Sequence, residues 1–337
     1  MRDALKTLFH PFESDVLAVP ASGQRVLFLG AEPGFRLPTG FGADLVLAQG
    51  LRPFTRGLEA AGYKVRPNAD GTDYDLVLVL CGRHRGQNEL RIADALDRVK
   101  ADGTILVAGS KEDGITSLRK RMGELVEIDG HLPKHHGVAF WLSRPADPSA
   151  VLGALREGNG EKLVDGRFHT APGMFSADEI DAGSRLLVAT LPQEISGAVA
   201  DFCAGWGYLA AEIAGRHPKI SALDLYEADF ASLEVARRNV AAAPVEPRFF
   251  WQDLLVEDVP HRYDLIVMNP PFHKGRAAEP DIGQGMIRAA AAALKPGGRL
   301  FMVANRQLPY ERTLAGAFST HAEIAGDALF KVISAGR

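Results

Sequence analysis

The 337-residue chain has few cysteines, no long apolar run and no large excess of either charge. Cys81 and Cys203 are its only cysteines, too few for a disulfide framework or a cysteine-rich metal site. No apolar run reaches the roughly 18 residues that a membrane-spanning helix needs. The first residues, MRDALKTLFHPFESD, lack the basic-then-apolar layout of a signal peptide. We therefore expect a cytoplasmic protein with reduced thiols, without a metal and without a membrane partner.

The charge balance argues against a broad basic surface. The formal net charge is −4, whereas nucleic-acid-binding proteins usually carry a basic face. Lysines and arginines equal the acidic residues in number over residues 1–150, so the acidic excess belongs to the remainder. Any RNA contact must come from local patches, and Arg83 and Arg85 are candidates for phosphate contacts.

The order of apolar and amphipathic segments predicts an α/β protein. Short runs rich in Val, Leu and Ile alternate with longer amphipathic stretches, which is typical of a mostly parallel sheet with helices on both faces. The length predicts two domains, over residues 1–150 and 160–337, and we expect a monomer. In the second half, strands are predicted at Leu186–Ala189, Ala198–Phe202, Ile220–Tyr226, Arg248–Trp251, Leu265–Met268 and Arg299–Ala304, and helices at Ala228–Ala241 and Gln284–Leu294.

The first half repeats the scheme of the second. A tyrosine precedes the apolar run Asp75–Leu80, just as a tyrosine precedes Asp264–Met268. Each run is followed by a helical pattern and then by a strand that opens with Lys-x-x-Gly, at Lys100 and at Lys295. Two matched elements at a matched separation favour an internal duplication of one Rossmann-like unit. The alternative is two unrelated α/β domains that share common strand and loop sequences.

A glycine-containing turn suggests a nucleotide-like ligand. Asp201-Phe-Cys-Ala-Gly-Trp-Gly207 lies where a predicted strand turns into a helix, and Gly205 and Gly207 permit a tight turn and close backbone approach. Methyltransferase turns usually read Asp-x-Gly-x-Gly-x-Gly, so Cys203 replaces the first glycine. The plainer alternative is an ordinary strand-to-helix turn.

Acidic residues at the following strand ends strengthen this interpretation. Glu227 ends the next strand, where a carboxylate can accept from both ribose hydroxyls. Asp224 is the rival acid, but it falls in the middle of that strand. Asp253 follows the third strand and could accept from the adenine amino group. Together these residues predict an adenosine pocket at the carboxyl edge of a parallel sheet.

A second motif points to the acceptor. Asn269-Pro-Pro-Phe272, followed by His273, comes directly after the strand Leu265–Met268. The Asn269 side-chain oxygen and the carbonyl of Asn269 or Pro270 can both accept from one NH₂ group. Phe272 offers a flat face for an extruded base. His273 could orient the substrate or take a proton, and a solvated loop histidine is the equal alternative.

The chain resembles the bacterial ribosomal RNA small-subunit methyltransferase C family. The likeness is strong over residues 165–337 and faint over 1–160. The motifs that carry it are Asn269–His273, Lys295–Gly298, Val303–Asn305, Leu308–Tyr310 and Thr170–Ser176.

The resemblance implies S-adenosylmethionine as the cofactor and 16S ribosomal RNA or the small subunit as the partner. It also implies a first domain that has lost its cofactor site and helps folding and RNA contact. The first-half counterparts of the two motifs, Gly30–Gly34 and Cys81–His84, agree with such a loss: Pro33 interrupts the first, and the second offers no paired acceptors.

The hypothesis is methyl transfer to the N2 amine of a guanine in ribosomal RNA. Asp201, Cys203, Gly205 and Gly207 would seat the methionine moiety beside Asn269, and Phe175 is a candidate wall of the substrate cleft. Adenine-N6, large-subunit guanine-N2 and protein glutamine methylation use the same paired acceptors and stay open. A non-catalytic RNA-binding or assembly protein is the alternative of another class.

Overall fold

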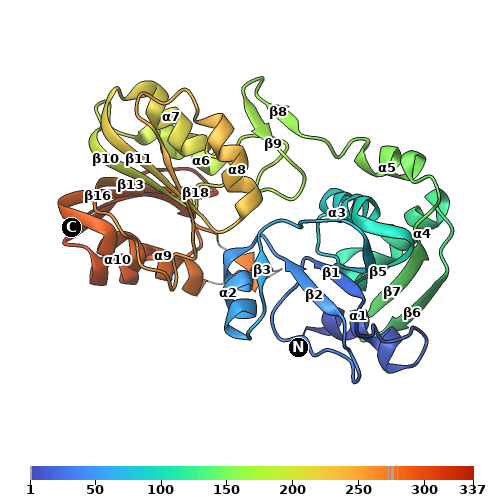
Figure 1. The fold of residues 1–337 in the computed structure, drawn as a ribbon. Coiled ribbons are helices and arrows are strands. Elements are labelled where there is room, and N and C mark those ends of the chain that lie inside the picture. Colours follow the sequence, from blue (N-terminus) through green and yellow to red (C-terminus); the bar gives the residue numbers. More distant parts are fainter. Residues whose placement is uncertain (1, 272, 275–276, 279) are drawn as a thin grey trace. The chain divides into compact units, whose positions relative to one another are not determined.

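The computed structural model describes residues 2–271, 273–274, 277–278 and 280–337 (Figure 1). The chain forms two compact units. The first comprises Met1–Glu161 with Ala171–Gly173, and the second comprises Lys162–Thr170 with Met174–Arg337. Each unit is built on its own seven-stranded sheet, so a single continuous sheet does not form.

The first unit contains a mixed sheet in the order β3-β2-β1-β4-β5-β7-β6. Only the pairings of β7 with β5 and β6 are antiparallel. The strands are β1 (Arg25–Leu29), β2 (Asp44–Ala48), β3 (Val65–Arg66), β4 (Tyr74–Leu80), β5 (Val99–Ser110), β6 (Gly130–Lys134) and β7 (Gly137–Ser143). The helices are α1 (Asp3–Glu13), α2 (Arg52–Ala60), α3 (Arg85–Arg98), α4 (Ile115–Leu125) and α5 (Ser149–Arg156), with a 3₁₀ turn at Lys111–Asp113.

The second unit has the same strand order, β12-β11-β10-β13-β16-β18-β17, with β18 antiparallel to both neighbours. Its sheet strands are β10 (Ser196–Phe202), β11 (Lys219–Glu227), β12 (Arg248–Trp251), β13 (Tyr263–Met268), β16 (Leu294–Asn305), β17 (Thr320–Gly326) and β18 (Phe330–Gly336). Two small hairpins pair β8 (Lys162–Val164) with β9 (Phe168–Thr170) and β14 (His273–Lys274) with β15 (Ala277–Ala278).

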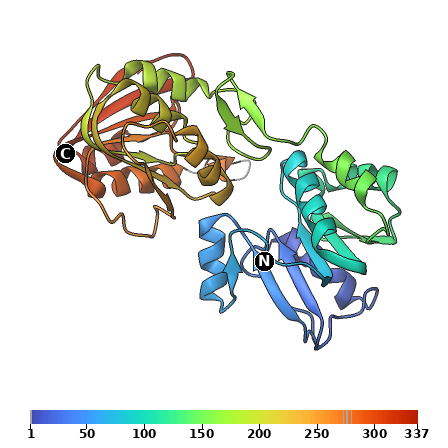
Figure 2. The same ribbon diagram turned by 45° about the horizontal axis from the view of Figure 1, so that its top comes forward.

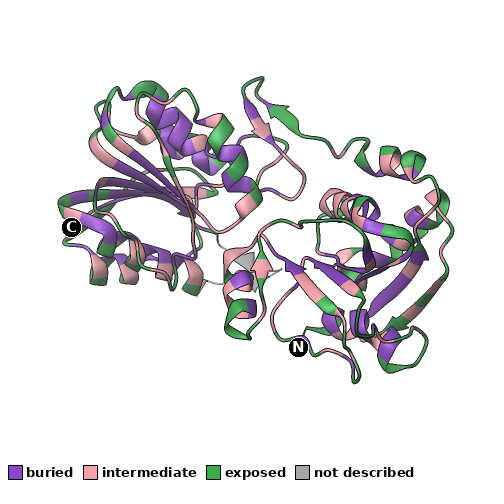
Figure 3. Ribbon diagram, in the orientation of Figure 1, coloured by how far each residue is buried: buried purple, intermediate pink, exposed green. Residues whose placement is uncertain are grey.

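Helices cover both faces of the second sheet (Figure 1). They are α6 (Ala182–Thr190), α7 (Tyr208–Arg216), α8 (Phe230–Asn239), α9 (Pro280–Ala293) and α10 (Glu311–Ala317). The first three lie on one face and the last two on the other, an arrangement that Figure 2 shows from another side. The central strands of both sheets are buried along most of their length (Figure 3), as expected for parallel strands covered on two sides.

The two sheets match in local detail as well as in strand order. In β4, the pairing with β5 shifts register between Tyr74 and Leu76; in β13, the pairing with β16 shifts between Tyr263 and Leu265. The aspartate within each shift accepts from the first residues of the neighbouring strand. Such shared irregularities, with the shared order, confirm the predicted pair of tandem Rossmann-like domains.

The same aspartates anchor the Lys-x-x-Gly openers noted in the sequence. Asp75 accepts from the Arg25 backbone N–H at 2.7 Å and from Lys100 Nζ at 2.5 Å. Asp264 accepts from the Ala198 backbone N–H at 2.8 Å and from Lys295 Nζ at 2.7 Å. The repeated motif therefore ties three adjacent strands together at their amino ends.

One predicted strand is wrong. Leu186–Ala189 lies inside α6 and not in a sheet. Asp181 caps this helix, because its carboxylate accepts from the Ser184 backbone N–H at 2.7 Å. A run of four apolar residues cannot distinguish a buried strand from the buried side of a helix, and here the capping residue decides. The other predicted strands and both predicted helices are present, with ends shifted by a few residues.

The units differ where the chain leaves the first central strand. In the second unit, α7 follows β10 directly. In the first unit, residues 30–43 connect β1 to β2 without any helix. The first unit therefore lacks the helix N-terminus that would face a ligand at this turn.

Candidate functional site

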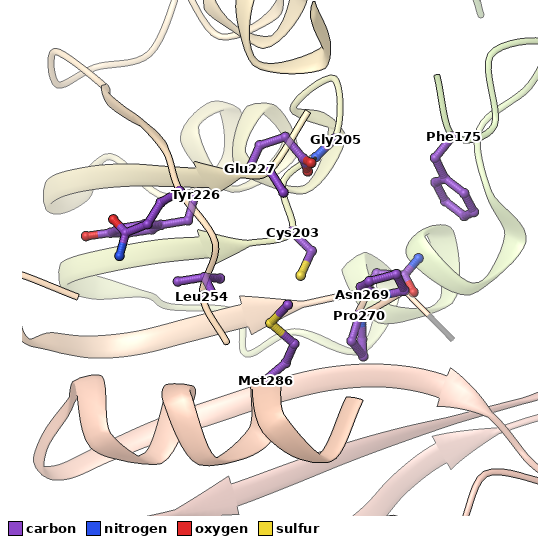
Figure 4. A pocket seen from close by; sticks show the side chains of 12 residues that line it. Phe175, Cys203, Gly205, Tyr226, Glu227, Leu254, Asn269, Pro270 and Met286 are labelled. Carbon is purple, nitrogen blue, oxygen red and sulfur yellow. The ribbon is translucent and has the colours of Figure 1, made fainter. Parts of the chain in front are cut away.

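A cavity of about 180 Å³ lies within the second unit, at the carboxyl edge of its sheet. The side chains that line it come from the ends of β10, β11 and β13, the segment after β12, helix α9 and the segment before α6 (Figure 4). The lining residues are Phe175, Cys203, Gly205, Tyr226, Glu227, Ala228, Gln252, Leu254, Asn269, Pro270, Pro271 and Met286. The strand order reverses between β10 and β13, which is where open α/β sheets place their ligands.

The turn after β10 keeps glycine-like geometry in spite of its cysteine. Cys203 has φ +60°, in the left-handed region that glycine occupies most easily. Gly205 has φ +55°, and a Cβ placed on it would meet no heavy atom within 4 Å among the described residues. Both residues line the cavity, so a ligand can approach this backbone closely. The replacement at Cys203 therefore preserves the path of the turn.

Gly207 allows two helices to pack closely behind the turn. It precedes α7 with φ +88°, and a Cβ on it would lie 3.1 Å from the Ala236 Cβ of α8. Its backbone N–H donates to the Ala204 carbonyl at 2.9 Å. Gly207 does not belong to the lining of the cavity. The absence of a side chain allows α7 and α8 to lie close together behind the turn.

Asp201 is a fully buried carboxylate with one unused acceptor. Its Oδ2 accepts from the Ala210 backbone N–H at 3.0 Å, whereas Oδ1 has no hydrogen-bond partner among the described residues. Burial, and secondarily the nearby charge of Glu227, raises the pKa of Asp201 to about 8. A buried acceptor without a donor is costly, which suits a position that receives a cationic or N–H ligand group.

This burial predicts a pH-dependent stability difference. The pKa of Asp201 is about 8 in the folded protein and 3.8 in an ordinary aspartate, so the folded state binds the proton more tightly than the unfolded state. The carboxyl group therefore destabilises the ligand-free protein increasingly as the pH rises from about 4 to 8. We expect Asp201→Asn to raise the free energy of unfolding by about 2 kcal/mol at pH 7. Urea unfolding of both proteins between pH 4 and pH 8 measures this. A gain in the unfolding free energy of Asp201→Asn that does not grow with pH would contradict this prediction.

Glu227 joins two turns at the cavity wall. Its Oε2 accepts from the Gly205 backbone N–H and its Oε1 from the Asp229 backbone N–H, both at 2.8 Å. Burial raises the pKa of Glu227 to about 7. The carboxylate thus lies at the end of β11, half-buried and facing the cavity, with lone pairs left for a diol (Figure 4).

The rival acid, Asp224, is occupied elsewhere. Its carboxylate accepts from Arg248 Nε and Nη2 at 2.7 and 2.8 Å, and from the Tyr263 hydroxyl at 2.5 Å. The Tyr263 hydroxyl is in turn hydrogen-bonded to the Tyr226 hydroxyl, with 2.6 Å between the two oxygens. The residue is fully buried within the sheet and does not line the cavity.

Asp253 lies beside the cavity without lining it. Its two neighbours, Gln252 and Leu254, are lining residues. The Asp253 carboxylate accepts from the Leu255 backbone N–H at 3.1 Å and caps the turn that follows β12. The adenine contact predicted for Asp253 stays a prediction.

The amide of Asn269 has a defined orientation. Its Nδ2 donates to Asp181 Oδ2 at 3.0 Å and to Ser184 Oγ at 2.9 Å. A carboxylate accepts but does not donate, so the amide nitrogen must face Asp181 and the amide oxygen must point away from it. Asn269 itself lines the cavity, beside Pro270 and Pro271 (Figure 4).

The segment after Asn269 is partly described. Pro270 is buried and lines the cavity; neither it nor Pro271 has a backbone N–H, so these two residues donate to no carbonyl. Phe272 lies outside the described residues. Of His273 the structure describes only the backbone, in β14. The stacking and proton-transfer roles predicted for these two residues are therefore untested.

Comparisons with known proteins agree on one relationship. Residues 165–334 match the family described as the methyltransferase small domain. A ribosomal RNA small subunit methyltransferase C from Escherichia coli K12 is 32% identical over 267 residues, covering 79% of this chain and 76% of that protein. The Citrobacter koseri protein of the same name is 30% identical, covering 81% of this chain and 79% of its own length. This chain belongs to the ribosomal RNA small subunit methyltransferase C family.

A solved structure of similar organisation extends the comparison to nearly the whole chain. The Thermus thermophilus 16S rRNA N2 G1207 methyltransferase, determined in complex with AdoMet and guanosine, aligns with a TM-score of 0.76 and 25% identity. The alignment covers 99% of this chain and 91% of that one. Both units therefore correspond to parts of a methyltransferase of this family, including the unit that the sequence related only faintly to it.

In this family member, Phe175 marks the rim of the cavity. Its side chain is 55% exposed although it is a large apolar group, and it lines the cavity. Its carbonyl accepts from Trp206 Nε1 at 2.8 Å, and Trp206 is buried against Phe168. Trp206 and Phe168 thus belong to the core, and they hold the backbone that presents Phe175.

The first unit of this methyltransferase places charged side chains at the corresponding sheet edge. Arg2 forms an ion pair with Glu32 at 3.1 Å, and Arg91 Nη1 donates to the Leu80 carbonyl at 3.0 Å. Burial raises the pKa of Glu32. A Cβ on Gly30 would lie 3.0 Å from Arg91 Nη1, so this arginine lies directly over the turn that corresponds to the cofactor turn.

Arg83 and Arg85 lie at the same edge of the first unit. Arg83 Nε is 3.5 Å from Asp113, and Arg85 Nε donates to Glu89 at 2.8 Å. Both side chains are largely exposed. They are not residues of the cavity of the second unit, and their predicted phosphate contacts stay predictions.

Two functional candidates were missed in the sequence. Asp181 and Ser184 hold the Asn269 amide, and no role is predicted for either from the sequence. The signal that could have found them is the Asp-x-x-Ser pattern of a helix start, which the wrongly predicted strand at Leu186–Ala189 obscured.

Among the described residues no group of three or more His, Cys, Asp or Glu side chains could hold a metal ion. None of the helices in the same part of the chain is long and apolar enough to cross a membrane.

Proposed function

We propose that this protein transfers a methyl group from S-adenosylmethionine to the exocyclic N2 amine of a guanine in 16S ribosomal RNA. The observation that carries the proposal is the orientation of Asn269 at the cavity wall: its amide nitrogen donates to Asp181 and Ser184, so its oxygen remains as an acceptor. An acceptor without a donor beside it selects NH₂ groups and repels carbonyl oxygens. The Escherichia coli relative is named a ribosomal RNA small subunit methyltransferase, and the Thermus thermophilus relative a 16S rRNA N2 G1207 methyltransferase, which supports this substrate class.

The residues of the second unit suit this cofactor. The buried Asp201 lies behind the turn that lines the cavity, and its Oδ1 has no hydrogen-bond partner among the described residues. The open space beside Gly205 admits a ligand against the backbone. Glu227 offers a carboxylate for the two ribose hydroxyls at the end of β11. S-adenosylmethionine, when bound, supplies a methyl group on an electrophilic sulfonium and leaves as S-adenosylhomocysteine.

The protein's contribution is alignment. An amine attached to an aromatic ring is a weak nucleophile, because its lone pair is delocalised into the ring. When Asn269 Oδ1 and the carbonyl of Asn269 or Pro270 accept its two N–H groups, the lone pair is left to face the methyl donor. The amine nitrogen gains the methyl group and then releases one proton to water, so the product amine is neutral. No strong base is needed for the methyl transfer itself.

The target base must leave its stack to reach this cavity. Phe175 provides an exposed aromatic face at the rim, fixed through its carbonyl to Trp206. We propose that the extruded guanine packs against Phe175, with Phe272 as a second face. We propose that the first unit supports folding and contacts RNA through the exposed Arg83 and Arg85; its lack of a helix after β1 argues against a cofactor site there. The protein would act where ribosomes are, in the cytoplasm.

Transfer of a labelled methyl group to three kinds of acceptor tests the proposal. Unmodified small subunits or their RNA should be labelled, whereas large subunits and release-factor protein should not. Label on large subunits would favour the large-subunit guanine reaction, and label on protein would favour glutamine methylation. No transfer to any acceptor, with no S-adenosylhomocysteine binding by calorimetry, would favour a non-catalytic RNA-binding protein.

A further inference from the structure

We propose that Asp181 and Ser184 are positioning residues that aim and polarise the Asn269 amide for methyl transfer. The inference rests on the proposed function, because it assigns the two residues a part in that same reaction. Neither residue lines the cavity, whereas Asn269 does. Two hydrogen bonds, at 3.0 Å and 2.9 Å, connect them to it.

These two bonds use both hydrogens of the Asn269 amide. An asparagine side chain can otherwise rotate by half a turn and exchange its oxygen and nitrogen at little steric cost. Here the exchange would bring the amide oxygen against the Asp181 carboxylate, which is repulsive. The partners therefore suppress the orientation that would present a donor to an amine substrate.

The two partners are held by the start of a packed helix. Asp181 Oδ2 accepts from the Ser184 backbone N–H at 2.7 Å as the cap of α6, in addition to its bond with Asn269. Ser184 is 7% exposed, and Leu187 and Val188 in the next turn are buried. A group fixed on a helix start holds a substrate-binding side chain more accurately than a group on a free loop.

The charge of Asp181 strengthens the acceptor. When an amide N–H donates to a carboxylate, the amide is polarised and its oxygen becomes a better acceptor. Positive charge develops on the substrate amine as it takes up the methyl group, so the stronger acceptor favours the transition state over the ground state. Removing Asp181 or Ser184 should therefore lower kcat more than it raises KM.

Helix α8 provides a matched control. Its cap is also Asp-x-x-Ser: Asp229 Oδ2 accepts from the Ser232 backbone N–H at 3.0 Å and from its hydroxyl at 2.6 Å. Ser232 is as buried as Ser184, at 4%. Ser184→Ala and Ser232→Ala each remove a buried hydroxyl from the start of a helix with the same cap. The Ser232 hydroxyl is bonded to Asp229, and the Ser184 hydroxyl is bonded to Asn269.

The test measures kcat and KM for RNA, the dissociation constant of S-adenosylhomocysteine and the thermal midpoint for three variants. We expect Ser184→Ala to lower kcat by about 5- to 10-fold, the effect of one lost hydrogen bond. Asp181→Asn keeps a good helix cap but loses the charge, and we expect a loss of about 10-fold or more. Cofactor affinity should stay within about twofold, and Ser232→Ala should keep wild-type kcat.

A double-mutant cycle separates positioning from a structural role. In an Asn269→Ala background, Ser184→Ala should have no further effect on kcat, because nothing is left to position. An equal loss in both backgrounds would overturn the inference, as would an unchanged kcat in both Ser184→Ala and Asp181→Asn. If those variants are unaffected while Asn269→Ala is inactive, the inference fails and the proposed function stands. If Asn269→Ala itself keeps near-normal transfer, both fail.

Discussion

Asn269→Ala is expected to lower methyl transfer by about 10²- to 10³-fold, comparable to the loss of one preorganised hydrogen-bonding group in other active sites. The dissociation constant of S-adenosylhomocysteine should change by less than about threefold, because we propose that the amide acts on the substrate amine and that the cofactor is held at the ends of β10 and β11. Single-turnover transfer of labelled methyl groups, with calorimetry for the cofactor, measures the two quantities separately.

The effects of Asn269→Ala on methyl transfer, cofactor binding and the thermal midpoint together distinguish a role in the reaction from damage to the fold. Alanine at position 269 leaves Asp181 still capping α6 through the Ser184 backbone N–H. The thermal midpoint should therefore fall by only a few degrees. If Asn269→Ala retains more than a tenth of wild-type transfer, or loses cofactor binding to the same extent as transfer, the role assigned to this amide is incorrect.

Glu227→Gln is expected to weaken S-adenosylhomocysteine binding by about 10-fold or more, since hydrogen bonds to a charged group contribute about 1.5–3 kcal/mol and those to a neutral amide about 0.5–1.5 kcal/mol. The variant keeps the size of the side chain. Glu234→Gln is a suitable control: Glu234 is a half-exposed residue of α8, paired with Arg237 at 2.8 Å and remote from the lining. Removing the charge of Glu234 should leave S-adenosylhomocysteine binding unchanged.

The pH dependence provides a second readout for Glu227. The ionised carboxylate is the binding form, and burial raises its pKa to about 7. Affinity for S-adenosylhomocysteine should therefore rise as pH increases towards 7 and level off above it, by up to about tenfold per pH unit on the acid side. The ratio of wild-type to Glu227→Gln affinity isolates this residue from Asp201. A ratio that is constant from pH 5.5 to pH 8.5 would contradict the ribose assignment.

Much of the fold could be predicted because the chain repeats itself. The tyrosine–aspartate pair that begins β4 and β13 and the Lys-x-x-Gly openers of β5 and β16 were visible in the sequence. The structure explains them: each aspartate binds a backbone N–H of one neighbouring strand and the lysine of the other. A motif that joins three strands is retained in both copies because the sheet needs it, whatever happens to the ligand site.

The site was only partly predictable, for two physical reasons. First, short apolar runs are ambiguous, and the helix mistaken for a strand at Leu186–Ala189 is the one whose start holds Asn269. Second, spacing shows which residues share a sheet edge but not where each side chain points. Asp201, Gly207 and Asp253 lie at or behind that edge without lining the cavity, whereas Cys203, Gly205, Glu227, Asn269 and Pro270 line it.

The difference between the two units at the corresponding sheet edges also follows from local structure. Both sheets have the same order, yet only the second has a helix directly after its first central strand. In the first unit, Asn88 closes the segment that corresponds to Asn269–Phe272, donating to the Gly82 carbonyl at 2.7 Å and accepting from its N–H at 2.9 Å. The first unit thus satisfies its own backbone where the second presents acceptors to a ligand.

The identity of the methylated nucleoside tests the central claim most directly. Small-subunit RNA that lacks the modification is incubated with the protein and S-adenosylmethionine, digested to nucleosides and analysed by mass spectrometry. The account predicts N2-methylguanosine from the wild-type protein and about 10²-fold less or none from Asn269→Ala. Methyl groups on adenine N6, on ribose or on a ring nitrogen would contradict it, because the acceptors beside Asn269 would then not be holding a guanine amine.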